Sequence, residues 1–108
     1  MAIKPLKTKG NIMEQEVNRP KFQLGRVVGT PGAVEALEEA NTNALALLAR
    51  HVRGDWGELN DDDKRENELS VKEGFRILSA YRLPTGVKVW VITEADRSAT
   101  TILLPSEY

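Results

Sequence analysis

Few side chains in this sequence are suited to proton transfer near neutral pH or to thiol chemistry. The chain contains one histidine, His51, and no cysteine. Because histidine alone has an ordinary pKa near neutrality, His51 is the candidate for proton transfer at physiological pH. It comes near the end of an expected helix, where a histidine more simply faces solvent and complements the negative end of the helix dipole. We therefore expect a surface residue there, with a catalytic role as the alternative.

A polar loop near the C-terminus is the most suggestive recognition element. Residues 94–98 combine two acids, an arginine and a serine between two expected strands. Loops fixed by strands often carry binding residues, which makes Glu94, Asp96 and Arg97 candidates. The alternative is structural, since aspartate and serine form turns by binding nearby backbone amides. A catalytic interpretation would combine Glu94 and Arg97 with His51.

Basic and aromatic residues on the expected strands form a further group. Arg76 and Arg82 lie on a strand near Trp90, and such side chains could stack RNA bases and contact phosphates. The alternative is that the arginines pair with Glu94 or Asp96 on a solvated rim of the sheet. The candidate binding residues are therefore Trp56, Arg76, Arg82, Trp90, Asp96 and Arg97.

Two motifs that resemble ligand sites do not meet the requirements of those sites. A calcium loop needs oxygen ligands at alternating positions, whereas Arg65 stands two residues after the acidic run 61–63. Asn60 with these acids instead favours the start of a helix. Residues 29–32 lack the lysine of a phosphate-binding loop, and their proline removes an amide donor. We expect no metal and no cofactor.

Length and composition limit the fold to one small domain. The chain has 108 residues, of which 41% are hydrophobic, and its formal net charge is -1. This supplies one core, and the balanced charge excludes the broad basic surface that strong nonspecific nucleic-acid binding needs. No apolar stretch approaches the roughly 20 residues of a membrane span. Without cysteine, disulfide frameworks and zinc–thiolate sites are also excluded. We expect a cytoplasmic protein.

The pattern along the chain predicts an α+β domain after a basic arm. Residues 1–22 carry five basic and two acidic residues without a sustained hydrophobic period, and we expect a mobile arm. Residues 23–108 form the domain. Its expected strands are 23–28, 75–83, 87–92 and 100–104, and its expected helices are 31–40, 44–53 and 61–72. Helices grouped before a β-meander favour two or three helices packed on a three- or four-stranded antiparallel sheet.

Helical spacing and strand alternation predict which side chains face the core. We expect Val34 and Leu37 on the inner side of the first helix. In the second helix, Leu45, Leu48, Ala49 and Val52 share the expected inner side. On the sheet, Val87, Val89 and Val91 should face the helices.

The opposite face of the sheet is also apolar and needs a cover. It would contain Leu78, Trp90, Ile92 and Leu103. A sheet covered on one side should not leave that much apolar surface in water. The cover could be the third helix, the N-terminal arm or another protein chain. This surface predicts a protein partner or a homodimer.

Residues 90–101 resemble the C-terminal part of the barnase-type microbial ribonucleases. In that family a Trp-bearing strand leads through Thr and Asp to a loop with a catalytic residue and a final strand. The resemblance implies RNA binding or cleavage through Arg76, Arg82, Arg97 and His51. Cleavage would need His51 to reach the loop, with Glu73 or Glu94 as the base. The sequence departs from the family pattern at Arg97, where the family has a histidine. Arginine stays protonated and cannot act as an ordinary general acid or base.

A broader similarity spans roughly residues 25–108. Residues 30–33, 51–57, 92–98 and 103–105 resemble small uncharacterised accessory proteins of plasmids, phages and integrative elements, some of them labelled restriction-system subunits. The resemblance implies a mobile-element protein that modulates host or defence machinery. The sequence thus predicts a non-catalytic protein-interaction or regulatory module, with an RNA-binding or RNA-cleaving protein as the alternative.

Overall fold

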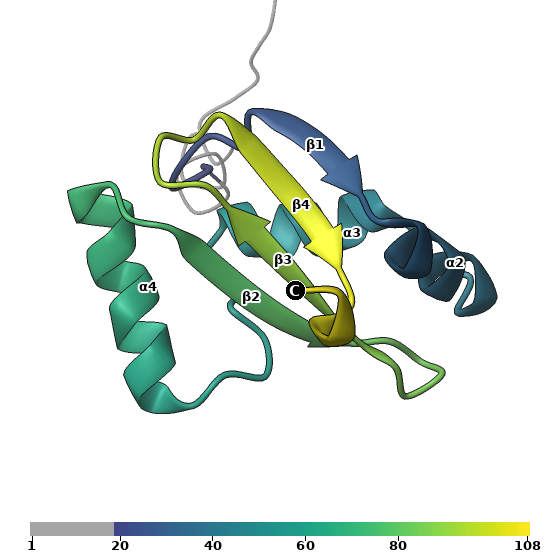
Figure 1. Ribbon diagram of the computed structural model, residues 1–108. Helices are drawn as coiled ribbons and strands as arrows, with labels where there is room; N and C mark the ends of the chain where they lie inside the picture. The colour runs from purple at the N-terminus through teal and green to yellow at the C-terminus, as the bar shows by residue number, and fades with distance from the viewer. Residues whose placement is uncertain (1–18) are drawn as a thin grey trace, which may run out of the picture.

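The computed structural model describes residues 19–108, which form a four-stranded sheet with three α-helices (Figure 1). The elements in chain order are β1 (Arg26–Gly29), α2 (Pro31–Glu39), α3 (Ala44–Val52), α4 (Asp61–Glu73), β2 (Ile77–Arg82), β3 (Lys88–Thr93), β4 (Ala99–Leu103) and the 3-10 turn η1 (Pro105–Glu107). The strand order is β1-β4-β3-β2. The predicted α+β class and the antiparallel meander of β2, β3 and β4 are confirmed.

Strand β1 differs from the prediction in its bounds and its direction. It covers Arg26–Gly29 instead of 23–28, and it runs parallel to β4, so the sheet is mixed. The long connection from β1 through the helices and the hairpin allows a parallel neighbour, which a tight turn would forbid. As expected, β1 lies at an edge of the sheet.

Helices α2 and α3 pack on one face of the sheet, which we call the helix face. The core between them and the strands is a cluster of small and branched side chains with one aromatic ring, namely Ala33, Ala36, Leu37, Leu47, Leu48, Tyr81, Leu83, Val89, Val91 and Ile102. Figure 1 shows α3 behind the sheet and η1 on the opposite side, which we call the front face. Helix α4 lies beside β2.

Local signals place the helix starts correctly. The side chain of Thr30 accepts a hydrogen bond from the Ala33 N–H at 3.2 Å, and Pro31 is the first residue of α2. The side chain of Asn60 accepts from the Asp63 N–H at 2.7 Å, and three acids occupy the first turn of α4. These caps satisfy amides that the helix itself leaves without acceptors, so a few neighbouring residues determine where each helix begins.

The predicted inner faces of α2 and α3 are partly wrong. Val34 is 45% exposed and Leu45 is 69% exposed. The buried residues are Ala33, Ala36 and Leu37 in α2 and Leu47, Leu48 and His51 in α3. Apolar residues lie on more than one side of α3, so helical spacing alone does not determine which side is buried. Packing against the sheet buries the side that contains His51 and leaves Leu45 in solvent.

The front face is covered in part by the chain's own C-terminus. Ile92 and Leu103 are buried, while Leu78 and Trp90 are half-buried. The Tyr108 ring packs edge-on against Trp90 with 5.6 Å between ring centroids. The C-terminal turn therefore supplies cover that the sequence analysis assigned to other elements.

Val87 departs from the expected valine stripe. It precedes β3, is 38% exposed and does not belong to the core, whereas Val89 and Val91 face the helices as predicted.

The free edge of β2 is occupied by other parts of the chain. The Asn67 side chain donates to the Leu78 carbonyl at 2.6 Å and accepts from the Leu78 N–H at 3.2 Å. Two residues further along, the Ala80 N–H donates to the Trp56 carbonyl at 3.1 Å, and the Ala80 carbonyl accepts from the Glu58 N–H at 2.7 Å. Backbone groups that an edge strand normally exposes are thus satisfied within the protomer.

The predicted N-terminal arm falls largely outside the described residues, because the structure describes none of residues 1–18. Phe22, the last residue of the predicted arm 1–22, is buried in a second cluster with Trp56 and Ile77. The Lys21 N–H donates to the Val52 carbonyl at 2.7 Å. The folded domain therefore includes Phe22.

Candidate functional site

His51 is buried, which contradicts the expectation of a surface residue. It is 0% exposed and points from α3 toward the sheet. Its Nδ1 lies 2.6 Å from the Ser79 hydroxyl on β2, and its Nε2 lies 2.9 Å from the Thr93 hydroxyl on β3. Rings of Phe22 and Trp56 contact it edge-on. Two hydroxyls from distant parts of the sequence offset the desolvation cost of burying the imidazole, because both ring nitrogens keep hydrogen-bond partners.

The hydrogen bonds around His51 have a defined direction. The Thr100 hydroxyl donates to the Leu24 carbonyl at 2.7 Å, so it accepts from the Thr93 hydroxyl, 2.7 Å away. Thr93 must then accept from the N–H at Nε2 of His51, and the neutral ring accepts at Nδ1 from Ser79. We call these four side chains, His51, Ser79, Thr93 and Thr100, the His51 network.

The His51 network is suited to holding the fold together. Burial lowers the pKa of His51 to about 4, so the ring is neutral at physiological pH. Ser79 and His51 have the separation of a nucleophile and its base, but both are 0% exposed. A substrate has no access to this pair in the folded protein.

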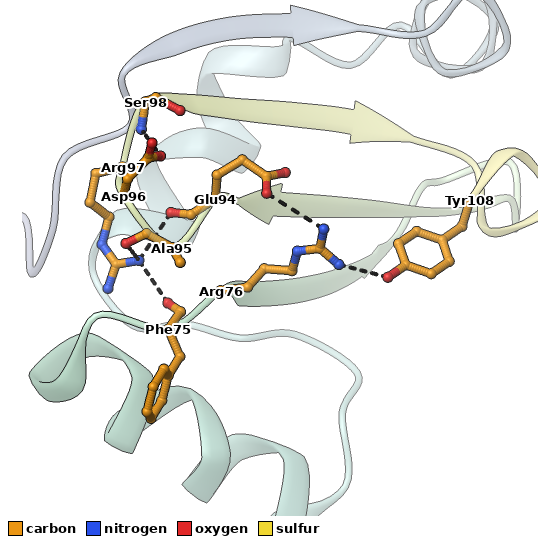
Figure 2. A network of polar contacts seen from close by, with 8 residues as sticks. All are labelled: Phe75, Arg76, Glu94, Ala95, Asp96, Arg97, Ser98 and Tyr108. Carbon is orange, nitrogen blue, oxygen red and sulfur yellow. Dashed lines mark hydrogen bonds and ion pairs between the residues drawn. The ribbon is translucent and has the colours of Figure 1, made fainter.

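Arg97 ties the 94–98 loop to the end of α4. Its guanidinium donates to the carbonyls of Phe75 at 2.7 Å and Ser70 at 2.8 Å. It also donates to the carbonyls of Glu94 and Ala95, both at 3.1 Å. Figure 2 shows the side chain bent back toward Phe75 and Ala95. A planar donor fork can satisfy several carbonyls at once, and here it joins segments that the sequence separates by more than twenty residues.

Asp96 closes the turn at the tip of the same loop. Its carboxylate accepts from the Ser98 N–H at 2.9 Å. Hydrogen bonds from the Ser98 side chain and backbone hold the pKa of Asp96 below its ordinary value. This is the turn geometry that the sequence analysis gave as the structural alternative.

A cluster on the front face brings together four side chains, which we call the front patch: Arg76, Trp90, Glu94 and Tyr108. Arg76 donates to the Tyr108 hydroxyl at 2.7 Å, and its guanidinium lies 3.5 Å from the Glu94 carboxylate. The pKa of Arg76 is raised, mainly by the nearby Glu94 carboxylate and to a smaller extent by Tyr108. Figure 2 shows Arg76 between the two partners. Tyr108 is 71% exposed and lies against Trp90. The pairing of Arg76 with Glu94 confirms one of the predicted alternatives.

Two other predicted binding residues lie apart from the front patch. Arg82 stands at the far end of β2 and binds the Glu58 carboxylate at 3.1 and 3.2 Å. Trp56 is 4% exposed, and its indole N–H donates to Glu68 at 2.9 Å. Tyr108 was not among the binding residues predicted from the sequence. The feature of the sequence that could have identified Tyr108 is an aromatic side chain shortly after the last predicted strand.

The three residues of the catalytic alternative do not share one set of contacts. His51 is held by hydroxyls in the interior, Glu94 binds Arg76 on the front face, and Arg97 binds backbone carbonyls. Within residues 19–108, no three His, Asp or Glu side chains are placed to hold a metal ion together. In the same part of the chain, no helix has the length and apolar character needed to cross a membrane.

Comparison with known proteins identifies no relative of this chain, so its function is inferred from the positions and contacts of its side chains. The sequence matches no protein-family model, and neither a curated protein nor a solved structure matches it. The resemblances drawn from the sequence remain predictions. The front patch is the surface cluster that combines predicted site residues from separate elements, and it is the candidate functional site.

Proposed function

We propose that this protein is a non-catalytic protein-interaction module that binds its partner through the front patch. The observation that supports this most directly is the exposed Tyr108 beside Trp90 and Arg76. Tryptophan, tyrosine and arginine are the residue types that most often dominate the binding energy of protein interfaces. Their mutual contacts also order the side chains before binding, which reduces the entropy lost when a partner docks.

The remaining candidate residues support binding over catalysis. The His51 network is closed to solvent, and the Arg97 guanidinium is used on four backbone carbonyls. A general acid or base must reach the proton that it transfers, either directly or through one water molecule. We therefore assign these groups to stability and the front patch to recognition.

RNA binding at the same patch is the alternative function. Trp90 and Tyr108 offer aromatic surfaces and Arg76 offers a cation, which is the combination that single-stranded RNA uses. Two observations favour a protein partner. Glu94 partly neutralises Arg76, and the chain has a formal net charge of -1. RNA cleavage would in addition need His51 to reach a bound phosphate.

The biological setting proposed for this module follows from the predicted resemblance to accessory proteins of mobile elements. In that setting the partner is a cytoplasmic component of the host or of a defence system. The patch chemistry suggests a partner segment with an apolar side chain for Trp90 and Tyr108 and an acceptor for Arg76.

A peptide-display selection against the immobilised full-length chain tests the proposed function. Peptides recovered from a random library are measured by titration against the wild-type protein and against Tyr108→Ala and Arg76→Glu. The matched control is Leu45→Ala, which removes a 69% exposed apolar side chain from α3 on the opposite side of the sheet. We expect peptide affinity to fall about tenfold or more in both patch variants and to stay unchanged in the control.

Two outcomes would contradict the proposal. One is a selection that yields only peptides whose binding is the same in Tyr108→Ala as in the wild type. The other is binding of single-stranded RNA that Tyr108→Ala abolishes and that weakens steeply with salt, which would favour the nucleic-acid alternative.

A further inference from the structure

Strand β1 lies at the edge of the sheet, and the backbone groups of alternate residues point away from the sheet. The Arg26 N–H donates to the Ser98 carbonyl at 3.0 Å, and the Thr30 N–H donates to the Ile102 carbonyl at 2.9 Å. In a strand the direction of these groups alternates, so the N–H and C=O groups of Val27 and Gly29 point outward. All four residues of β1 are exposed. The strand can therefore accept another strand.

The two sides of β1 carry different side chains. Val28 is level with Thr101, which pairs with Ile92, so Val28 lies on the front face. By alternation Arg26 and Thr30 share that face, while Val27 and Gly29 lie on the helix face. On the helix face, a Cβ atom added to Gly29 would lie 3.2 Å from the Val34 side chain. Val27, Val28 and Val34 are 42%, 39% and 45% exposed.

A fixed negative charge lies at the end of β1 on the front face. The Glu107 carboxylate accepts hydrogen bonds from the Thr30 hydroxyl, the Gly32 N–H and the Leu104 N–H. The bond from Thr30 contributes most to holding the pKa of Glu107 below its ordinary value. No cationic side chain among residues 19–108 forms an ion pair with this carboxylate, and none of the ion pairs there includes Arg26.

We propose that β1 pairs antiparallel with β1 of a second copy of this chain, with Val28 facing Val28 across a two-fold axis. Val27 then stands opposite Gly29 of the second copy, and the two residues exchange both of their backbone hydrogen bonds. The symmetry repeats this exchange on the other side of the axis. The two four-stranded sheets join into one sheet of eight strands.

Side-chain complementarity selects this register. Arg26 stands opposite Thr30 of the second copy, whose hydroxyl holds the Glu107 carboxylate. Each end of the interface therefore brings Arg26, which forms no ion pair within residues 19–108, to a fixed anion. Val27 stands opposite Gly29, where the absence of a side chain leaves Val34 accessible. A register with Val27 facing Val27 would place Arg26 opposite Val28 and would form no ion pair.

The proposed pairing uses none of the front-patch residues. It therefore goes beyond the proposed function and can succeed or fail independently of it. The outer edges of the joined sheet would be the two β2 edges, which Asn67 and residues 56–58 already occupy. This arrangement gives a dimer that adds no further strands.

Sedimentation of the full-length chain over a range of concentrations tests the pairing. We expect the mass to rise from 12.0 kDa to twice that value as concentration increases. Arg26→Glu places like charges together at both ends and should raise the dimer dissociation constant about tenfold or more. Val27→Pro removes an outward N–H that β4 does not use, and it should also weaken the dimer. Lys72→Glu, an equal change of charge on α4, is the control.

A charge-removing variant sharpens the test. In a Glu107→Gln background, Arg26→Glu should weaken the dimer less than it does in the wild type, because the repulsion is gone. A protein that stays at 12.0 kDa at all concentrations overturns the proposal. A dimer that forms equally well in Arg26→Glu and Val27→Pro also overturns it, since its interface then lies elsewhere. Circular dichroism of each variant verifies that it is folded.

Discussion

The two edges of the sheet differ in how their backbone groups are satisfied. At β2, Asn67 binds both polar groups of Leu78, and residues 56–58 bind both polar groups of Ala80. At β1, the outward groups of Val27 and Gly29 receive no such partner from the part of the chain that the structure describes. Natural proteins protect exposed edges because these promote association. The difference indicates that contacts at the β2 edge stabilise the protomer, whereas the β1 edge keeps backbone groups with which another strand could pair.

This contrast predicts that variants at the β2 edge reduce protomer stability, whereas variants at the β1 edge mainly change assembly. The largest effect should come from Gly57→Ala. The φ angle of Gly57 is +76°, and an added Cβ would lie 1.9 Å from the Ala80 carbonyl oxygen. Backbone strain and overpacking together should lower the free energy of unfolding by about 4 kcal/mol, measured by urea denaturation.

Gly86→Ala, in the turn between β2 and β3, gives the cost of backbone strain without overpacking. Gly86 has a φ of +94° with no atom within 4 Å of an added Cβ. It should cost only about 1 kcal/mol. Equal losses in the two variants would show that the close approach of residue 57 to β2 contributes nothing.

Asn67→Ala should have the next largest effect. It leaves the N–H and C=O of Leu78 without their partners at a buried position of α4. Two unsatisfied backbone groups should cost about 3 kcal/mol of unfolding free energy in the same assay. Ser70→Ala is the matched control. The Ser70 hydroxyl donates only to Glu66 of its own helix, so its loss should cost under about 1 kcal/mol. A loss as small for Asn67 would remove the argument for a closed edge.

Acidification should destabilise the protein through His51, whose network holds the Leu24 carbonyl just before β1. The pKa of His51 is 6.5 when it is unperturbed and about 4 in the fold. The unfolded chain therefore binds the proton first, and stability falls as the pH drops below about 6.5. From about pH 8 to about pH 5 the loss attributable to His51 should be about 2 kcal/mol.

The pH effect is measured by urea denaturation at several pH values. His51→Gln should lower stability overall and remove this part of the pH dependence. Hydrogen exchange should show the change first at the start of β1, where the Arg26 N–H donates to the Ser98 carbonyl. If the wild type and His51→Gln lose the same stability over this range, His51 does not titrate in this way.

The smallest effect on stability should come from Val27→Lys at the β1 edge. Because Val27 is 42% exposed, the variant should change the unfolding free energy by under about 0.5 kcal/mol when measured on dilute protein. It should nevertheless weaken dimerisation, as lysine does on edge strands. Leu45→Lys on α3 is the control for both measurements. A loss above about 1 kcal/mol in dilute protein would show that β1 is already covered within the protomer.

Features that depend on a few neighbouring residues were predictable from the sequence. Thr30 and Asn60 cap helices through bonds that span three residues. The hairpin of β2 and β3 follows from the alternation of apolar residues and from the turn between them. The pairing of Arg76 with Glu94 was one of the alternatives considered.

Features that depend on distant partners were not predictable in the same way. The end of a helix gives His51 a local reason to face solvent, but Ser79 and Thr93, 28 and 42 residues away, determine its burial. The parallel pairing of β1 and the cover that Tyr108 provides are likewise long-range contacts. A single sequence contains no signal that fixes such distances.

The two tryptophans lie in environments that can be read separately by fluorescence. Trp56 is enclosed in the interior with its indole 6.1 Å from the His51 ring, whereas Trp90 is half-buried beside Tyr108. Because a protonated imidazole quenches a nearby indole, emission from Trp56 should report the charge on His51. Emission from Trp90 should shift to shorter wavelength when a bound molecule excludes water. Single-tryptophan variants would therefore give one optical signal for the interior and another for the surface.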